Sequence, residues 1–259
     1  MSGGRVTEEP RVAIVGAGPG DPELLTVRAA RLIAAADDLL VDALVPAAVY
    51  HGSRARLVYV GKRAGRPSVG QRRIEEILVR LARAGRRVVR LKGGDPCLFG
   101  RGGEEMRALE AAGVPYLLVP GVTSALAAPA AAGIAVTDRG QAESVTIVTG
   151  HRRAGHPEPV PPLPAYEAER TVVVLMGLGA LTELVDRALA DGYPPDLPAA
   201  VVSKATLPGQ RTVAAPLADL PAKVAEADLE TPATVVIGRV AQRAEANAAI
   251  PAERLARMG

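Results

Sequence analysis

The chain has 259 residues, of which 48% are hydrophobic and 23% charged, and its formal net charge is +3 at pH 7. Aromatic residues make up only 2% and tryptophan is absent, which leaves too few stacking side chains for a nucleic-acid partner. The single cysteine excludes an internal disulfide, and the histidines have no zinc-ligand spacing with it, so we expect no metal. No apolar run approaches the ~20 residues of a membrane span. We therefore expect a cytoplasmic protein with no membrane partner.

Short β-branched runs alternate with helical patterns in the first half of the chain, after a polar tail at residues 1–10 that we expect to be flexible. This alternation predicts parallel strands joined by crossover helices. The candidate strands are residues 11–15, 39–41, 57–60, 88–91 and 116–119.

Two helices of this half have recognisable starts. Asp21 and Pro22 suit the N-cap and the first residue of one helix. Ser68 and Gln71 have the spacing of a capping box before a second helix. Its core-facing stripe repeats at helical spacing through Ile74, Ile77, Leu78 and Leu81.

The second half of the chain has candidate strands at residues 145–148, 171–175, 199–202, 211–214 and 234–237. Pro120 and Gly121 precede a small-residue helix at 124–132, so we place a boundary there, between an N-terminal α/β lobe at 1–121 and a C-terminal α/β lobe at 122–259. The proline-rich segment 152–166 predicts an exposed loop. We expect an α/β protein whose two lobes each surround a mainly parallel sheet.

Glycine is concentrated directly after two of the predicted strands. Residues 90–105 read Arg-Leu-Lys-Gly-Gly-Asp-Pro-Cys-Leu-Phe-Gly-Arg-Gly-Gly-Glu-Glu, and residues 16–21 form a second glycine loop. Glycine permits positive φ and close approach of a ligand to the backbone, so these loops predict a small-molecule site, although Gly-Gly-Asp-Pro is also a good turn. Gly16 and Gly18 open a dinucleotide fingerprint, but Asp21 stands where its third glycine belongs, and Pro19 lacks an N–H.

Five stretches together carry a family resemblance: residues 15–26, 60–65, 90–105, 120–125 and 232–238. They resemble the uroporphyrinogen-III C-methyltransferases, a branch of the tetrapyrrole methylase family, and the resemblance spans about residues 11–243. It implies a homodimer of two-lobed chains with the active site in the cleft between the lobes. It also implies two methylations of uroporphyrinogen III by S-adenosylmethionine, at C2 and C7, which yield precorrin-2 and S-adenosylhomocysteine for sirohaem or cobalamin biosynthesis.

The resemblance further assigns roles to residues. It implies that S-adenosylmethionine contacts Pro19, Gly93, Gly94, Asp95, Leu98, Thr123, Ser124, Met176, Ala205 and Thr234. It makes Asp42 the proton acceptor and Lys62 the proton donor; read without the family, Asp42 caps a turn and Lys62 is a solvated side chain. The family carries Tyr and Arg on either side of that aspartate, whereas this chain has Val41 and Ala43.

Uroporphyrinogen III is a polycarboxylate, so we expect cations around its site. The cations expected to bind it are Arg63, Arg66, Arg101 and Arg152, with Arg153 beside them. The resemblance adds Met176 as a substrate contact. Three other functions stay open: a later precorrin methyltransferase of the same fold, a nucleotide-binding oxidoreductase, and a non-catalytic binding protein. By the resemblance, the run from Val60 to Gly65 together with Arg101 to Glu105 favours uroporphyrinogen III over later precorrins. Pro19 and Asp21 argue against the oxidoreductase.

Overall fold

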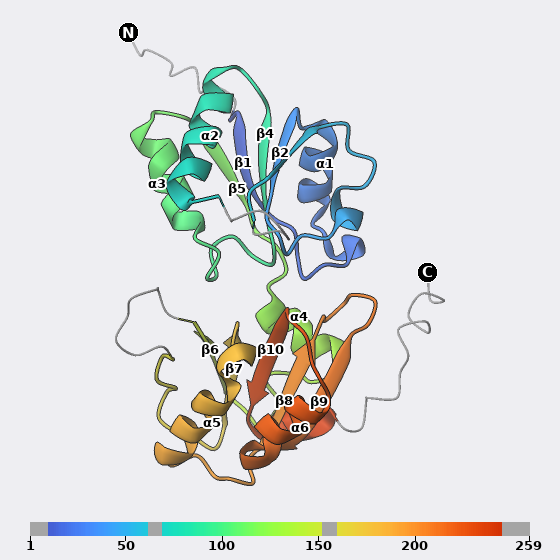
Figure 1. Cartoon of the computed structure of the whole chain (residues 1–259), viewed down its shortest axis with the longest axis vertical. Helices are drawn as coiled ribbons and strands as arrows, with labels where there is room; N and C mark the ends of the chain where they lie inside the picture. The colour runs from blue at the N-terminus through green and yellow to red at the C-terminus, as the bar shows by residue number, and fades with distance from the viewer. Residues whose placement is uncertain (1–9, 62–68, 152–159, 245–259) are drawn as a thin grey trace. The chain divides into compact units, whose positions relative to one another are not determined.

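The structure is a computed structural model that describes residues 10–61, 69–151 and 160–244 (Figure 1). The chain divides into two compact units, Met1–Thr123 and Ser124–Gly259. The boundary predicted from the sequence is Gly121. No helix in the described parts of the chain has the length and apolar character needed to cross a bilayer.

The first unit is built on a five-stranded sheet in the order β3-β2-β4-β1-β5, and every pair in it is parallel. Its strands are β1 (Val12–Gly16), β2 (Asp38–Val41), β3 (Arg56–Tyr59), β4 (Val88–Lys92) and β5 (Tyr116–Val119). All five predicted strands of this half are therefore confirmed. Because the strands are parallel, the loops that follow them meet at one edge of the sheet.

Helices cover both faces of this sheet (Figure 1). The helical segments are η1 (Pro22–Leu24), α1 (Val27–Ala35), η2 (Ala47–Tyr50), α2 (Gln71–Arg83) and α3 (Gly102–Ala111). Side chains alternate along β1, so Ala13 and Val15 pack on the α1 side while Val12 and Ile14 pack on the α2 and α3 side. The inner strands β1, β2 and β4 are consequently buried along their whole length, whereas the edge strand β3 is largely exposed.

The helix starts differ from their predictions in detail. Asp21 does accept a hydrogen bond from the Glu23 N–H, but it caps the short 3-10 helix η1, and Thr26 caps α1. At the start of α2 the N-cap position is Gly70 and makes no side-chain hydrogen bond, so the capping box expected at Ser68 does not start the helix; Ser68 lies outside the described residues.

Neighbouring strands β1 and β4 send the chain to opposite faces of the sheet. Helix α1, which follows β1, packs through Ala29 and Ile33 on one face. Helix α3, which follows β4, packs through Leu109 on the other. In open α/β sheets a ligand binds outside the strand ends at such a switch point. The two glycine-rich loops of the sequence start there.

The second unit contains another five-stranded sheet, in the order β6-β7-β10-β8-β9. Its strands are β6 (Ser144–Thr149), β7 (Arg170–Leu175), β8 (Pro198–Ser203), β9 (Arg211–Pro216) and β10 (Ala233–Ile237). The strand positions are confirmed, but the mainly parallel arrangement expected for this lobe is wrong. In the described residues β6 and β7 pair in parallel and the other three pairs are antiparallel. Residues 204–210 join β8 to β9 directly, too short a link for the dozen or more residues of a parallel crossover.

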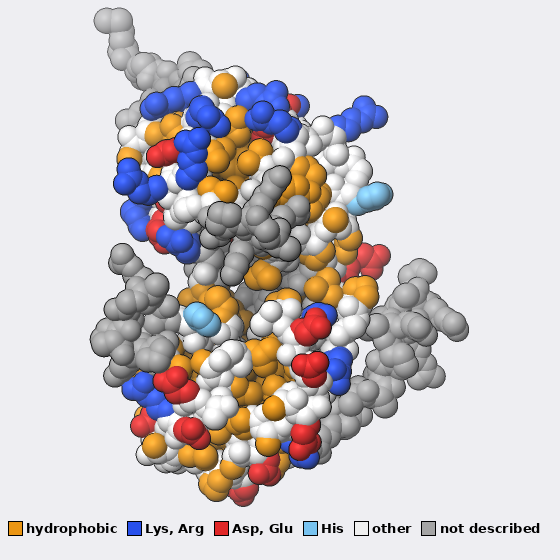
Figure 2. Space-filling view, viewed as in Figure 1, with side chains coloured by type: hydrophobic (Ala, Val, Ile, Leu, Met, Phe, Trp, Pro, Cys, Tyr) orange, Lys and Arg blue, Asp and Glu red, His pale blue; other side chains and the backbone are white. Residues whose placement is uncertain are grey.

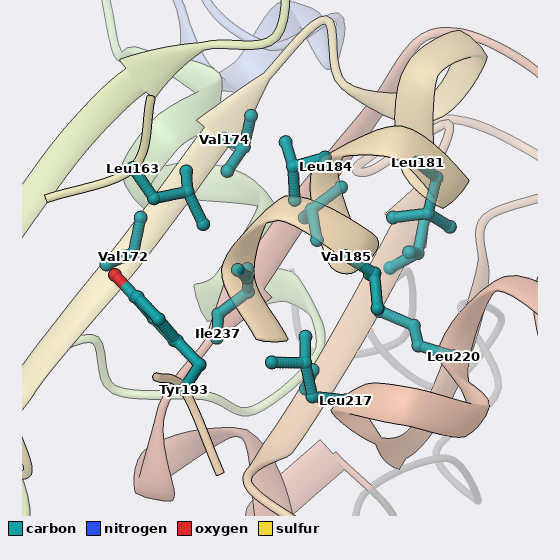
Figure 3. Packing of buried hydrophobic residues seen from close by; sticks show 14 of the residues in the cluster. Leu163, Val172, Val174, Leu181, Leu184, Val185, Tyr193, Leu217, Leu220 and Ile237 are labelled. Carbon is teal, nitrogen blue, oxygen red and sulfur yellow. The ribbon is translucent and has the colours of Figure 1, made fainter. Parts of the chain in front are cut away.

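Helices and strands of the second unit enclose its main core on one face of the sheet (Figure 3). The helical segments are α4 (Ser124–Ala131), η3 (Leu178–Ala180), α5 (Leu181–Ala190), η4 (Leu217–Asp219), α6 (Leu220–Glu226) and η5 (Arg239–Gln242). Leu184 and Val185 of α5 pack on Val172 and Val174 of β7. Ala128 of α4 and Val240 of η5 lie in a separate cluster with Val236 of β10, on the other face.

The proline-rich segment is not an exposed loop throughout. Val160 and Leu163 are buried in the main core of the second unit, with 1% and 7% of their surface exposed. The Tyr193 hydroxyl donates a 2.7 Å hydrogen bond to the Pro164 carbonyl. The apolar residues between the prolines therefore anchor this stretch, although residues 152–159 lie outside the described parts of the chain.

Candidate active site

The glycine-rich loops of the first unit bind each other through their backbones. Gly18 and Gly94 form an isolated antiparallel bridge, with N–H to carbonyl distances of 3.2 and 2.7 Å. The Ala17 N–H adds a 2.7 Å hydrogen bond to the carbonyl of Lys92. Gly18 and Gly94 have φ angles of 70° and 64°, in the left-handed region that favours glycine. The loops after β1 and β4 thus form one rigid backbone surface at the switch point.

Part of the glycine content serves packing and part leaves space. A Cβ on Gly16 would lie 2.5 Å from the Gly121 nitrogen, and one on Gly121 would lie 2.3 Å from the Gly94 carbonyl oxygen. Neither position tolerates a side chain. A Cβ on Gly93 would meet only the Leu44 Cβ, at 3.5 Å, which is an ordinary contact. Gly93 therefore presents open backbone beside Leu44, whose side chain is 61% exposed.

Asp95 joins two of these loops. Its Oδ1 accepts a 2.8 Å hydrogen bond from the Cys97 N–H, which caps the Asp-Pro turn. Its Oδ2 accepts a 3.1 Å hydrogen bond from the Gly121 N–H, in the loop after β5. Both carboxylate oxygens thus accept from backbone donors. The bond from Cys97 fits the turn interpretation of this residue, and the bond from Gly121 adds a link to a second loop.

Replacing Asp95 with alanine is expected to lower the free energy of unfolding by about 1–2 kcal/mol, because two backbone N–H groups lose a charged acceptor. Urea denaturation of the purified protein measures this change. Asp95→Asn keeps the size of the side chain and one acceptor oxygen, and should fall between wild type and Asp95→Ala. An Asp95→Ala protein as stable as wild type would show that the loops do not depend on this carboxylate.

Asp42, the predicted proton acceptor, lies directly after β2 at the same edge of the sheet. Its Oδ1 accepts a 2.5 Å hydrogen bond from Nη2 of Arg90, and its side chain is 29% exposed. Arg90 is itself 2% exposed and donates through Nη1 to the carbonyls of Leu40 and Leu91, each at 3.3 Å. A buried arginine with fixed partners therefore orients a carboxylate that solvent can still reach.

Two further charges complete this cluster. Glu105 of α3 is fully buried, and its Oε1 accepts from Arg90 Nε at 2.9 Å and from Lys92 Nζ at 3.1 Å. The Lys92 Nζ also lies 3.9 Å from Asp42 Oδ2. Burial, and then the positive charge of Arg90, lower the pKa of Lys92 against the opposing pull of Glu105 and Asp42. We call Asp42, Arg90, Lys92 and Glu105 the charge cluster.

The sequence analysis missed three members of the charge cluster. Arg90, Lys92 and Glu105 lie within the glycine-rich run, but no role was expected for them. A signal was present in β4, where Arg90 and Lys92 alternate with Leu91 in a strand otherwise made of valine and leucine. Residues two apart share a face of a strand, so two cations on one face of a central strand require a buried anion.

The cations expected around the substrate are described only in part. Arg101 binds Glu104 through two hydrogen bonds, of 2.8 and 2.7 Å, and its side chain is 55% exposed. Lys62, Arg63, Arg66, Arg152 and Arg153 lie outside the described residues. Other basic side chains gather over the α2 and α3 side of the first unit (Figure 2), where Arg72, Arg80 and Arg83 line a surface groove together with Glu75 and Glu76.

The remaining expected cofactor contacts of the first unit lie at or near the same edge. Pro19 and Leu98 are half-buried within the two glycine loops, and Thr123 is half-buried after β5. Ser124 begins α4 in the second unit.

Within the second unit, the other expected contacts lie at one edge of its sheet. Thr234 of β10 is opposite Leu175 at the end of β7, and the neighbouring Ala233 is opposite Ser203 at the end of β8. Met176 follows β7 with a φ of 59° and is 47% exposed, and Ala205 follows β8. Thr234 itself is 3% exposed, which fits a wall residue.

A family model described as Tetrapyrrole (Corrin/Porphyrin) Methylases matches residues 11–221. The chain belongs to the tetrapyrrole methylase family. A solved structure in this family, uroporphyrin-III C-methyl transferase from Thermus thermophilus complexed with S-adenyl homocysteine, is 42% identical and has a TM-score of 0.76. That match covers 90% of this chain and 99% of the other.

Two further relatives have sequence identities to this chain that are similar to that of the solved structure. Siroheme synthase 1 of Halorhodospira halophila is 47% identical over 240 residues, covering 92% of this chain and 49% of the relative. The chloroplastic S-adenosyl-L-methionine-dependent uroporphyrinogen III methyltransferase of Arabidopsis thaliana is 47% identical over 234 residues, covering 89% of this chain and 63% of the relative. The chain thus spans about half the length of the siroheme synthase and more of the plant enzyme.

Proposed function

We propose that the chain is an S-adenosylmethionine-dependent methyltransferase that methylates uroporphyrinogen III at C2 and C7 to give precorrin-2. The observation that carries the proposal is Asp42, a solvent-accessible carboxylate fixed by a buried arginine at the switch point of the parallel sheet. The names of the two relatives and of the Thermus thermophilus structure support the same reaction. The run from Val60 to Gly65, with Arg101 to Glu105, resembles enzymes that act on this substrate more than those that act on later precorrins.

The residues at the edge of the first sheet fit the methyl donor. Gly93 offers open backbone beside the exposed apolar Leu44, which suits a ligand with a flat adenine ring, whereas Gly16 and Gly121 are closed by packing. When bound, S-adenosylmethionine supplies an electrophilic methyl group as a sulfonium. We propose that Pro19, Gly93, Gly94, Leu98 and Thr123 contact it in the first unit, and that Asp95 acts by holding the loops.

Further contacts are proposed in the second unit. These are Ser124, Met176, Ala205 and Thr234, with Met176 also contacting the substrate. Met176 is exposed at the end of β7, so a ligand at this edge reaches it, whereas Thr234, opposite the last residue of that strand, is 3% exposed and is proposed as part of the wall behind it.

Asp42 is proposed to accept the proton that the reaction releases. A carbon–carbon bond forms from the π electrons of the pyrrole ring as the sulfur–methyl bond breaks, and its electron pair stays on sulfur. The ring then carries a positive charge, which disappears when it loses a proton to a base. The hydrogen bond from Arg90 holds the Asp42 carboxylate in one orientation before the substrate binds, so no conformational freedom of the base is lost during the reaction.

The remaining roles concern the polycarboxylate substrate. We propose that Lys62 donates a proton and that Arg63, Arg66, Arg101 and Arg152 pair with substrate carboxylates. Arg101 is the one of these arginines that falls in the described parts of the chain, and its bidentate pair with Glu104 is exposed. An exposed ion pair contributes little stability, so exchanging Glu104 for a substrate carboxylate costs little.

We further propose a cytoplasmic homodimer. Two-fold dimers are the commonest soluble oligomers, and the family resemblance favours one. Light scattering at micromolar concentration is expected to give twice the chain mass of 26.7 kDa. A monomer there would contradict the dimer without affecting the proposed reaction.

The direct test is an assay of the purified protein with uroporphyrinogen III and methyl-labelled S-adenosylmethionine. The expected product carries two labelled methyl groups, and two molecules of S-adenosylhomocysteine form per substrate. Binding of S-adenosylhomocysteine with label transfer only to a later precorrin would identify the alternative enzyme of the same fold. No binding of S-adenosylhomocysteine would reject the methyltransferase.

Replacing Gly93 with valine is expected to weaken binding of S-adenosylhomocysteine at least tenfold with little change in melting temperature, because the added methyl groups enter the space proposed for the ligand and not the packed backbone. Isothermal titration calorimetry measures the affinity. Gly121→Ala is the matched control, since its Cβ would lie 2.3 Å from the Gly94 oxygen and should destabilise the fold instead. Unchanged affinity in Gly93→Val would move the cofactor site away from this loop.

A further inference from the structure

Asp42 faces two cations that come from the same face of one strand. Its Oδ1 is 2.5 Å from Arg90 Nη2, and its Oδ2 is 3.9 Å from Lys92 Nζ. Arg90 and Lys92 are two residues apart in β4, which is the central strand of the sheet and the neighbour of β2. Their side chains therefore both lie on the α2 and α3 side of the sheet, and both reach the Asp42 carboxylate from there.

Glu105 competes with Asp42 for these two cations. Its Oε1 accepts from Arg90, Lys92 and, at 3.4 Å, from Gln71 Nε2, while its Oε2 is buried and has no hydrogen-bond partner among the described residues. All of the contacts of the carboxylate are thus concentrated on one oxygen, and two of its three donors also face Asp42. A change of charge at Glu105 must therefore alter how strongly Arg90 and Lys92 attract the Asp42 carboxylate.

We propose that Lys92 and Glu105 are positioning residues that act on the reaction through Asp42. Lys92 stabilises the charged form of the Asp42 carboxylate, and Glu105 weakens this stabilisation because it binds the same cations. Their action on methyl transfer rests on the proposed function. Neither residue touches the substrate, because their side chains are 3% and 0% exposed, whereas Asp42 is 29% exposed. Asp42 is therefore the point at which solvent and ligand reach the charge cluster.

The two residues have opposite effects on Asp42. Arg90 and Lys92 attract the Asp42 carboxylate, and the Glu105 carboxylate binds the same two cations. Loss of the Lys92 charge leaves Asp42 with one cation shared with Glu105, so Asp42 takes up a proton more readily. Loss of the Glu105 charge leaves both cations to Asp42, so it takes up a proton less readily. A purely structural role would not produce opposite signs.

The test is an NMR titration of the Asp42 carboxyl carbon in the full-length protein. In Lys92→Met the titration midpoint is expected to rise by about 1 pH unit, and in Glu105→Gln it is expected to fall by a similar amount. The matched controls are Lys223→Met and Glu226→Gln, which remove the same charges from an exposed pair in the second unit. Neither control should move the Asp42 midpoint.

Wild-type protein provides a second readout that needs no variant to fold. The Lys92 Cε resonance should show an inflection at the pH where Asp42 titrates, because the two groups are coupled. Midpoints that stay at the wild-type value or move in the same direction in the folded variants would overturn the proposal. An absent inflection at Lys92 would overturn it as well.

Activity then links the coupling to catalysis. The acid limb of the plot of kcat against pH is expected to move to higher pH in Lys92→Met and to lower pH in Glu105→Gln. The affinity for S-adenosylhomocysteine is expected to stay within twofold of wild type. A chain that shows the opposite midpoint shifts but does not methylate uroporphyrinogen III would retain the positioning roles and reject the proposed function. Opposite midpoint shifts with an unmoved acid limb would reject the action on the reaction.

Discussion

Replacing Arg90 with methionine is expected to lower the free energy of unfolding by about 3–5 kcal/mol. Methionine fills much of the same volume, but Glu105 then keeps a buried negative charge without its 2.9 Å partner. The carbonyls of Leu40 and Leu91 also lose a donor. Removing one partner of a buried ion pair costs far more than the pair contributes, because the remaining charge stays desolvated. Guanidinium denaturation monitored by circular dichroism measures the loss.

The control for this experiment is Arg73→Met, the same substitution at an exposed pair. Arg73 binds Glu76 at 2.9 Å, but the two side chains are 59% and 55% exposed. Its loss is expected to cost less than about 1 kcal/mol. Equal effects of the two substitutions would mean that the charge cluster is hydrated, contrary to its burial in the structure.

Replacing Asp42 with asparagine is expected to lower kcat by about 10²- to 10⁴-fold, since asparagine keeps the size of the side chain but cannot accept a proton at neutral pH. Affinity for S-adenosylhomocysteine should change little, because Asp42 is not among the proposed cofactor contacts. Single-turnover methylation of uroporphyrinogen III at saturating concentration separates the chemical step from binding and product release. The substitution also weakens the contact to Arg90, so stability must be measured in parallel.

Asp37→Asn is the matched control for this loss of a carboxylate. Asp37 immediately precedes β2, whereas Asp42 follows it, and its hydrogen bonds to Arg87 lower its pKa to about 2. It is therefore ionised throughout the assay range, and its substitution removes a charged carboxylate at the other end of the same strand. Asp37→Asn is expected to methylate at the wild-type rate. If Asp42→Asn did so too, Asp42 would not be the base, and the positioning of the two substrates would have to explain the methyl transfer.

Much of the fold follows from local sequence alone. The ten strands were predictable because each contains a short run of β-branched or apolar residues, and burial on both faces makes such runs continuous in inner strands such as β1 and β7. The glycine loops after β1 and β4 were predictable because positive φ and close backbone approach require that residue. These loops are two of the five stretches that carry the resemblance to the family.

The direction of the strands in the second sheet was not predictable in this way. A strand reads alike whether its neighbour is parallel or antiparallel, and only its connection to the next strand and the pairing decide between them. β10 lies between β7 and β8, antiparallel to both, although β7 and β8 precede it by many residues. This pairing places Thr234 beside the end of β7.

From the sequence alone, the glycine loops and Asp42 could be placed directly after strands of the first sheet. The partners that hold Asp42 became apparent only in the folded chain. Glu105 is fifteen residues from Arg90 along the chain, and the packing of α3 on β4 brings their side chains to 2.9 Å. A charge buried in the low-polarity interior needs an opposite charge close to it in space. That partner can come from any part of the sequence, so no local pattern specifies it.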